Sequence, residues 1–282
     1  MNTLVSTDWL AQHCGGPGII VLDASAHLPA AGRDPAAEFD QAHIPGARFL
    51  GLPSLTDTGS AVPSALPNAA QFAQRMQELG VTAADRVVLY DNSMLRSSAR
   101  AYFIFTMFGF SNAAVLDGGL GKWTAEGRDL ETGAAAVDGS QFHIPRSDHR
   151  RVRSKADMLD NIATGTEQVV DARDAGRFTA DIEDAVHGLA GGHIPGARNL
   201  HFVQLLQDDG TFKDPAGLRA AFRAAGIDLA APVTASCGSG MTASVVLFAL
   251  ELIGHERTAL YDGSWSEWGA DPETPKEAGP AA

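Results

Sequence analysis

Ser236-Cys237-Gly238-Ser239-Gly240-Met241-Thr242-Ala243 is the stretch around which the rest of the chain is organised. The apolar residues 232–235 before it predict a buried strand, and residues 244–252 after it predict a helix. A cysteine between a strand and a helix lies among backbone N–H groups without partners, at the positive end of the helix dipole. These surroundings stabilise a thiolate, so the sequence predicts that Cys237 is a nucleophile.

The alternative for Cys237 is a small buried side chain in a tight turn. The two glycines and two hydroxyl residues that follow it favour the reactive interpretation. Gly238 and Gly240 allow the backbone to curl around the sulfur and form an anion-binding nest. Ser239 is close enough to donate to a bound carbonyl or to relay a proton, whereas Thr242 could instead cap the helix.

The sequence Cys-Gly-Ser-Gly-Met-Thr-Ala at residues 237–243 resembles the active-site loop of the 3-mercaptopyruvate sulfurtransferases, a family of the rhodanese superfamily. The resemblance implies an active-site loop that includes Gly238, Gly240, Met241 and Thr242. Thiosulfate sulfurtransferases of the same superfamily carry basic residues directly after their cysteine, and this loop has none there. The related phosphatases use a longer loop that ends in arginine, so phosphatase chemistry is disfavoured.

The composition of the 282 residues argues against several classes of protein. A net charge of −13 argues against a nucleic-acid-binding surface and against binding to an anionic membrane. No segment approaches the roughly 20 apolar residues that span a bilayer, and residues 1–8 lack the basic and apolar regions of a signal peptide. Cys14 and Cys237 suggest no disulfide, and no set of metal ligands surrounds Cys14. These features predict a cytoplasmic protein without a metal site.

The chain contains an internal duplication. His43-Ile44-Pro45-Gly46-Ala47-Arg48 recurs intact at residues 193–198. Val21-Leu22-Asp23-Ala24 is matched by Val169-Val170-Asp171-Ala172, and the pair Asp117 and Trp123 is matched by Asp262 and Trp268. Three matches in the same order indicate tandem domains, because so long a period does not fit a solenoid.

Each half alternates short apolar strands with helices, which predicts an α/β fold built on parallel sheets covered on both faces. The resemblance implies two tandem rhodanese-like domains over nearly the whole chain. Helices are expected at residues 69–79, 97–108, 215–225 and 242–253, and strands at 86–90 and 232–235. Chemistry then belongs at the carboxyl ends of the strands, where Cys237 falls.

Differences between the halves suggest the domain organisation. Residues 1–130 are expected to form a non-catalytic domain, because Asp91 stands where the second half has Cys237. Residues 131–153 are rich in Ala, Gly, Ser and charged residues and are expected to be a linker. Residues 154–282 are expected to form the catalytic domain, with a mobile tail from residue 271.

Two arginines are candidates for binding the substrate. Arg177 matches an arginine that binds the substrate carboxylate in the resembled family, and a guanidinium can form two parallel hydrogen bonds to a carboxylate. The alternative is an ion pair of Arg177 with Asp174 or Asp181. A second arginine of the family would fall at Val186, and we expect Arg96 of the first half to replace it. The alternative for Arg96 is a solvated loop residue.

The resemblance also implies that His43 assists proton transfer and that Asp34 pairs with it. A histidine titrates near neutral pH and can move a proton there. Because His43 recurs as His193, the alternative is that both histidines stabilise the turn. The alternative for Asp34 is a solvated loop carboxylate. Trp265 and Trp268 are expected to pack in the core.

The resemblance, together with these residues, implies a sulfurtransferase. In the reaction that it implies, the Cys237 thiolate takes sulfur from 3-mercaptopyruvate, and pyruvate leaves as an enolate that is protonated through Ser239 or His43. The persulfide then passes its sulfur to thioredoxin, a small thiol or cyanide. No cofactor is expected, because cysteine itself carries the sulfur, and neither nucleic acid nor membrane is an expected partner. Two alternatives stay open: thiosulfate as the donor, and a non-catalytic persulfide carrier or redox-sensing module.

Overall fold

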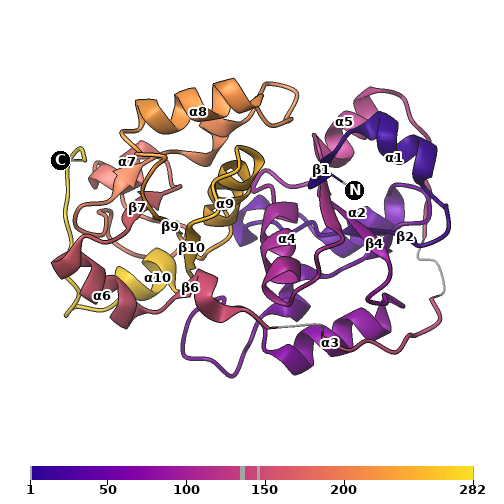
Figure 1. Cartoon of the computed structure of the whole chain (residues 1–282), viewed down its shortest axis with the longest axis horizontal. Helices are drawn as coiled ribbons and strands as arrows, with labels where there is room; N and C mark the ends of the chain where they lie inside the picture. Colours follow the sequence, from indigo (N-terminus) through magenta and orange to yellow (C-terminus); the bar gives the residue numbers. More distant parts are fainter. Residues whose placement is uncertain (1, 134–136, 145–146, 282) are drawn as a thin grey trace. The chain divides into compact units, whose positions relative to one another are not determined.

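The chain divides into two compact units, and the computed structural model describes its residues 2–133, 137–144 and 147–281 (Figure 1). Unit 1 consists of Met1–Asp57, Leu66–Asp148 and Asp208–Thr211. Unit 2 consists of Thr58–Ala65, His149–Gln207 and Phe212–Ala282. Among the described residues, each unit contains one parallel sheet of five strands. The predicted fold, two tandem α/β domains with parallel sheets, is confirmed.

The sheet of unit 1 has the strand order β1-β5-β4-β2-β3. The strands are β1 Leu4–Val5, β2 Ile19–Asp23, β3 Arg48–Phe49, β4 Arg86–Tyr90 and β5 Ala113–Leu116. The α-helices are α1 Thr7–His13, α2 Pro35–Gln41, α3 Ala69–Glu78, α4 Ser98–Met107 and α5 Gly119–Ala125. Helices α1 and α5 cover one face of this sheet, and α3 and α4 cover the other (Figure 1). The helices expected at 69–79 and 97–108 and the strand at 86–90 are confirmed as α3, α4 and β4.

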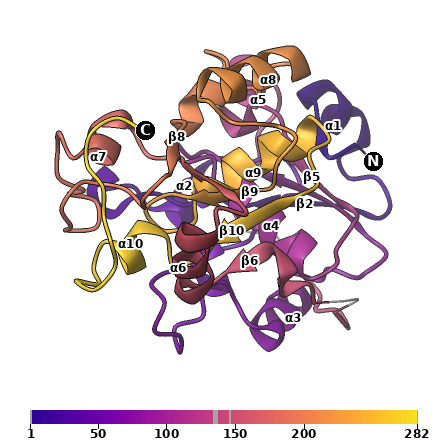
Figure 2. The same ribbon diagram turned by 60° about the vertical axis from the view of Figure 1, so that its left-hand side comes forward.

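The sheet of unit 2 repeats this arrangement with the strand order β6-β10-β9-β7-β8. The strands are β6 Val152–Arg153, β7 Gln168–Asp171, β8 Arg198–Asn199, β9 Val233–Ser236 and β10 Thr258–Tyr261. The α-helices are α6 Lys155–Thr164, α7 Ala175–Thr179, α8 Pro215–Ala224, α9 Ala243–Leu252 and α10 Ser264–Trp268. Helices α8 and α9 lie on one face, and α6 and α10 lie on the other (Figures 1 and 2). No helix of the described residues has both the length and the apolar character needed to cross a membrane.

Strand β9 is the central strand of the second sheet, between β10 and β7. All four of its residues are buried, as expected for a parallel strand that is covered on both faces. Ser236, its last residue, pairs in register with Asp171, the last residue of β7. The ends of these strands therefore lie at one edge of the sheet, where ligands bind in open parallel sheets. Cys237 is the first residue beyond this edge.

Aromatic side chains fill the core of each unit. In unit 1, the rings of Phe72 on α3 and Phe108 on α4 stack with their centroids 4.6 Å apart. In unit 2, Trp265 and Trp268 of α10 are buried in one cluster with Phe178 of α7. The expectation that these two tryptophans pack in the core is confirmed.

The repeated His-Ile-Pro-Gly sequence forms the same turn in both units. Gly46 has a φ of +72°, and the N–H of Ala47 donates to the carbonyl of Ile44 at 2.9 Å. Gly196 has a φ of +76° in the second copy of the turn. A positive φ at the third residue is the mark of a type II turn, and it explains the glycine in both copies.

The described part of the expected linker packs on the units. Phe142 is buried, and its ring contacts Phe72 edge-on with the centroids 5.8 Å apart. Val152 and Arg153 form β6, an edge strand of the second sheet. Residues 134–136 and 145–146 of this segment lie outside the described residues. The proposed domain boundaries at 130 and 154 stay a prediction.

The mobility expected for the C-terminal tail is wrong. Thr274 is buried, and its hydroxyl donates to the carbonyl of Trp268 at 2.6 Å. Glu277 exchanges two backbone hydrogen bonds with His193, each 2.9 Å long. The tail therefore holds the repeated turn of unit 2 in place through backbone hydrogen bonds. The three prolines of the tail do not prevent these bonds, because Glu277 supplies both the N–H and the carbonyl.

Candidate active site

Cys237 follows β9 directly and is 2% exposed. Its N–H donates to the hydroxyl of Ser264 at 3.2 Å, and its carbonyl accepts from the N–H of Trp265 at 2.9 Å. The carbonyl of Gly238 accepts from the N–H of Ser266, also at 2.9 Å. The first turn of α10 therefore fixes the backbone on which the sulfur is carried.

The loop between β9 and α9 leaves a run of backbone donors free. The N–H groups of residues 238–243 donate to no acceptor among the residues that the structure describes, and pairing resumes at Ser244. Gly240 has a φ of +76°, which glycine adopts without the strain of a Cβ. Free N–H groups at the start of a helix form an anion-binding site, and this one begins next to the cysteine.

In the equivalent loop of unit 1, backbone N–H groups hold the side chain of an aspartate. Asp91 follows β4 as Cys237 follows β9, and it is 2% exposed. Its carboxylate accepts from the N–H groups of Ser93 at 3.0 Å and of Ser98, the first residue of α4, at 2.8 Å. Because the two units share one fold, the loop of unit 2 offers comparable donors to a sulfur anion.

The loop side chains differ in what they contact. Ser239 is partly exposed, and its hydroxyl bonds to no side chain or backbone group of the described residues. Met241 is also partly exposed. The predicted capping role of Thr242 is wrong, because its backbone is already helical and its side chain makes no capping hydrogen bond. The hydroxyl of Ser244 donates to the carbonyl of Gly240 at 2.9 Å.

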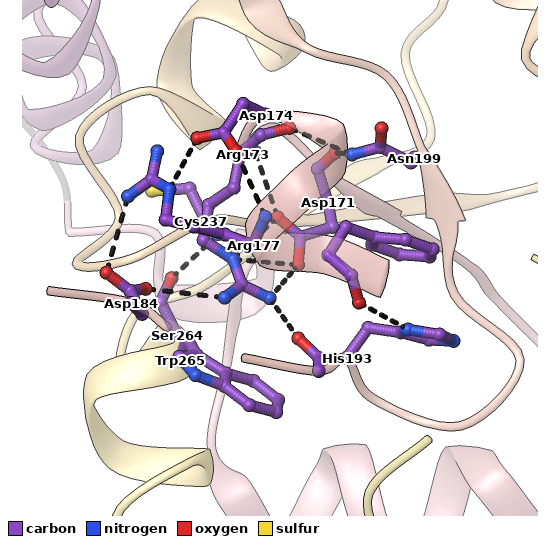
Figure 3. A network of polar contacts seen from close by, with 12 residues as sticks. Asp171, Arg173, Asp174, Arg177, Asp184, His193, Asn199, Cys237, Ser264 and Trp265 are labelled. Carbon is purple, nitrogen blue, oxygen red and sulfur yellow. Dashed lines mark hydrogen bonds and ion pairs between the residues drawn. The ribbon is translucent and has the colours of Figure 1, made fainter. Parts of the chain in front are cut away.

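A buried ion-pair network surrounds Arg173, which is 1% exposed (Figure 3). Its Nη2 donates to Asp171 Oδ2 at 2.6 Å and to the carbonyl of Gly192 at 2.6 Å. Its Nη1 donates to Asp184 Oδ2 at 3.3 Å. The guanidinium also lies over the ring of Trp265, 4.5 Å from the centroid, as a cation–π contact. The network thus joins the end of β7 to α10, the helix that holds Cys237.

Arg177 lies at the edge of this network and is 19% exposed. Its Nε donates to Asp174 Oδ2 at 2.5 Å, and its Nη1 donates to Asp184 Oδ1 at 3.4 Å. The ion pair with Asp174 that the sequence left as an alternative is therefore present. Nη2 of Arg177 donates to no group of the described residues, so one end of the guanidinium is available to a ligand.

Asp184 connects both arginines to His187. Its side chain is fully buried, and its Oδ1 lies 3.0 Å from Nδ1 of His187. Burial raises the pKa of Asp184, but the hydrogen bond from His187 and the charges of His187, Arg177 and Arg173 outweigh it and lower the pKa to about 2. Asp184 is therefore an ionised acceptor at neutral pH.

His187 lies against the backbone of the cysteine loop. A Cβ on Gly238 would come within 2.7 Å of Nε2 and 2.9 Å of Nδ1 of this ring, and closer still to Cε1. Gly238 has no positive φ, so it is not needed for the curl of the loop that the sequence suggested. The absence of a side chain at this position instead admits His187.

His43 and His193 occupy equivalent places in the repeated turn. Their exposed fractions are 0% and 1%, and their rings stack on Phe39 and Phe178 with centroids 4.0 Å and 3.8 Å apart. Nδ1 of each ring lies within hydrogen-bond distance of the carbonyl of the same phenylalanine, at 2.7 Å and 2.9 Å. This shared geometry favours the alternative in which both histidines stabilise the turn.

Asp34 caps a helix. Its Oδ1 accepts from the N–H groups of Ala36 and Ala37 at 3.0 Å and 3.2 Å, at the start of α2. Since Nδ1 of His43 faces the carbonyl of Phe39, the structure does not bring the expected pair Asp34 and His43 together.

Arg96 adopts a left-handed backbone conformation with a φ of +53°. Its guanidinium packs over Gly210, where a Cβ would lie 3.0 Å from Cζ of the arginine. Both residues belong to unit 1, whereas Cys237 belongs to unit 2. A role of Arg96 toward the substrate of Cys237 stays a prediction.

Sequence reasoning did not assign Arg173, Asp184 or His187 to the site. Arg173 stands two residues after Asp171, at the end of a buried strand, where a charged residue needs a partner. His187 follows Asp184 by three residues, a spacing that allows their side chains to meet in a turn. These two signals were available, but neither indicates contact with a loop some fifty residues further along the chain.

Comparison with known proteins identifies the family. The rhodanese-like domain family matches residues 6–126 and 154–271. The chain is 38% identical over 274 residues to 3-mercaptopyruvate sulfurtransferase of Escherichia coli strain K12, with 97% of each chain covered. It is 36% identical over 282 residues to thiosulfate sulfurtransferase of Cricetulus griseus, covering 97% of this chain and 94% of that one. The crystal structure of SseA from Escherichia coli matches 94% of this chain and 99% of its own, with a TM-score of 0.85 at 36% identity. With two matched domains over most of its length, the chain belongs to the rhodanese-like family.

Proposed function

We propose that the chain is an enzyme that takes sulfur from 3-mercaptopyruvate, holds it as a persulfide on Cys237 and passes it to thioredoxin, a small thiol or cyanide. The observation that supports this best is the loop of free N–H groups that follows a buried cysteine at the carboxyl edge of the sheet. The relatives named 3-mercaptopyruvate sulfurtransferase support the choice of donor.

The proposed reaction has two steps at one sulfur atom. The Cys237 thiolate attacks the thiol sulfur of the donor, an S–S bond forms, and the C–S bond breaks. The electron pair of that bond stays on carbon as the enolate of pyruvate, which takes up a proton and leaves. An acceptor thiolate or cyanide then attacks the outer sulfur, and Cys237 is released as a thiolate that the loop N–H groups stabilise.

We assign the other candidate residues as follows. Ser239, whose hydroxyl has no partner among the described residues, donates to the donor carbonyl, where negative charge develops in the first step. Nη2 of Arg177 binds the donor carboxylate. We assign His43 to the turn and Asp34 to the cap of α2, and not to proton transfer, because of the contacts that each one makes.

The direct test of this function is steady-state release of pyruvate from 3-mercaptopyruvate with cyanide as the acceptor. A sulfurtransferase releases many equivalents of pyruvate per chain. Release of one equivalent followed by arrest would contradict the proposal and favour the non-catalytic carrier.

Thiosulfate is the second candidate donor, because the chain also resembles a thiosulfate sulfurtransferase at 36% identity. Thiosulfate is a dianion, and residues 238–243 contain no lysine or arginine that could bind its charge. We therefore expect 3-mercaptopyruvate to be the preferred donor. Comparing kcat/KM for the two donors at one acceptor concentration separates them. A higher kcat/KM with thiosulfate would overturn the choice of donor.

We further propose a cytoplasmic location. Both Cys14 and Cys237 are free thiols in the structure. A reducing compartment keeps such thiols from oxidising, and the proposed persulfide chemistry needs the thiolate of Cys237.

Arg177→Ala is expected to raise the KM for 3-mercaptopyruvate by about tenfold or more, at about 1.4 kcal/mol for each factor of ten. The reason is the loss of a charged hydrogen bond to the donor carboxylate, which contributes about 1.5–3 kcal/mol.

If Arg96 supplies a second hydrogen bond to the carboxylate of the sulfur donor, Arg96→Ala raises the KM for 3-mercaptopyruvate by a similar factor with little change in melting temperature. Arg223→Ala, on an exposed position of α8, is the control and should leave KM unchanged. An unchanged KM in Arg96→Ala would remove that residue from the site.

A further inference from the structure

We propose that His187, in its protonated form, is a binding group for the carboxylate of the sulfur donor, so that the affinity for the donor falls as this imidazole loses its proton. The inference rests on the function proposed above and adds a residue to it. His187 is 17% exposed, and its ring lies against Gly238, the residue after the nucleophile. It therefore reaches the surface next to Cys237.

The hydrogen bond to Asp184 decides which nitrogen of the ring can act. Asp184 is ionised at neutral pH and can only accept, so Nδ1 of His187 carries the hydrogen that points to it. Nε2 is then the atom that gains or loses a proton. It has no partner among the described residues, and of the two ring nitrogens it lies nearer to the Cβ position of Gly238. Protonation turns Nε2 from an acceptor into a charged donor beside the loop.

Asp184, the partner of His187, belongs to an ion-pair network that has one more negative than positive group. On the end of β7 and on α7 and the following turn, three carboxylates, those of Asp171, Asp174 and Asp184, meet two guanidinium groups, those of Arg173 and Arg177. With a neutral His187 this cluster carries one net negative charge, which would repel both a thiolate at Cys237 and a substrate carboxylate. With a protonated His187 the cluster is neutral.

Among the residues that the structure describes, the two other histidines near this cluster do not supply the missing positive charge. His201 interacts with Asp174 and Arg177, but burial lowers its pKa, the charge of Asp174 opposes this, and the net shift is downward. His201 is therefore neutral at neutral pH. His193 is 1% exposed and stacked on Phe178, so it cannot reach a ligand.

The test is the ratio of the KM for 3-mercaptopyruvate in His187→Gln to that in the wild type, measured from about pH 6 to about pH 9. Glutamine keeps a donor for Asp184 and a similar length but carries no charge. The ratio cancels the titration of the donor, which is the same in both assays, and kcat at each pH reports any change in the thiolate of Cys237. We expect a ratio of about ten near pH 6, or about 1.4 kcal/mol, that falls to about one near pH 9, with kcat changed less than about threefold. His255→Gln, in the loop after α9, is the matched control and should give a ratio of one throughout.

A ratio that stays constant over the pH range, whether it is ten or one, would overturn the proposal, because a merely structural role does not titrate with the imidazole. The melting temperature of each variant at the same pH values verifies that the folded protein is being compared. If the wild type does not release pyruvate from 3-mercaptopyruvate at all, the proposed function fails and this inference fails with it. If the wild type releases pyruvate and only the ratio is flat, the function stands and His187 is not a binding group.

Discussion

Cys237→Ser is expected to lower the rate of pyruvate release from 3-mercaptopyruvate by at least about a thousandfold, as removal of a nucleophile does in other enzymes that use covalent catalysis. A serine hydroxyl is barely ionised at neutral pH and cannot form a persulfide. The loop N–H groups and Arg177 remain in this variant, so binding of the donor is expected to survive. Steady-state assays of wild type and variant at the same donor and acceptor concentrations measure the effect.

Cys14→Ser is the matched control for that prediction. The thiol of Cys14 donates to the carbonyl of Pro45 at 2.9 Å, in unit 1 and next to the repeated turn. Its replacement should keep the activity within about twofold of the wild type, because a serine hydroxyl can make the same hydrogen bond. Loss of activity in Cys14→Ser with retention in Cys237→Ser would show that the nucleophile has been assigned to the wrong cysteine.

Arg173→Met is expected to lower the free energy of unfolding by about 3–5 kcal/mol, the cost of leaving a buried charge without its partner. The carboxylates of Asp171 and Asp184 are 4% and 0% exposed, and this guanidinium binds both. Methionine fills part of the volume over Trp265 but donates to neither carboxylate. Urea unfolding followed by tryptophan fluorescence measures the loss, with Arg223→Ala on α8 as a surface control.

Arg173→Lys distinguishes charge from geometry in the same network. Lysine restores one positive charge but not the planar set of donors that reaches Asp171, Asp184 and the carbonyl of Gly192 together. We expect its stability to lie between those of Arg173→Met and the wild type. An Arg173→Met protein within about 1 kcal/mol of the wild type would mean that the buried network contributes little to stability.

The sequence alone predicted those parts of the fold and of the site whose signal lies in neighbouring residues or is repeated along the chain. The alternation of apolar strands and helices predicted α3, β4, α4, α8, β9 and α9, and the repeated turn sequence predicted two copies of one fold. Cys237 could be located because a glycine-rich turn between a strand and a helix is visible in eight consecutive residues. Periodicity and turn chemistry act over such short distances, so they can be detected without a structure.

The sequence alone did not predict features that depend on contacts between segments far apart in the chain. Glu277 and His193 pair through their backbones, which no side-chain pattern records, so the tail was wrongly expected to be mobile. Gly238 was explained by loop curvature, whereas its neighbour in space is His187, which lies in a different segment. The capping role of Thr242 is wrong for a local reason, because the backbone of this residue is already helical and its side chain makes no capping hydrogen bond.

The loop of unit 1 also supports the proposal that backbone N–H groups stabilise a thiolate at Cys237. The carboxylate of Asp91 accepts two backbone hydrogen bonds at the position where unit 2 carries Cys237. The duplicated fold thus places a carboxyl group in one copy and a thiol in the other. We infer that the two loops share their capacity to stabilise negative charge and differ in whether the charged atom can accept sulfur.

The most direct measurement is the mass of the intact wild-type protein after mixing with 3-mercaptopyruvate in the absence of any acceptor, followed by peptide mapping. We expect a gain of one sulfur atom per chain, located on the peptide that contains Cys237, together with one equivalent of pyruvate. We also expect cyanide to remove this sulfur and restore the original mass. Added sulfur on the peptide of Cys14, or pyruvate released with no sulfur on Cys237, would contradict the persulfide account.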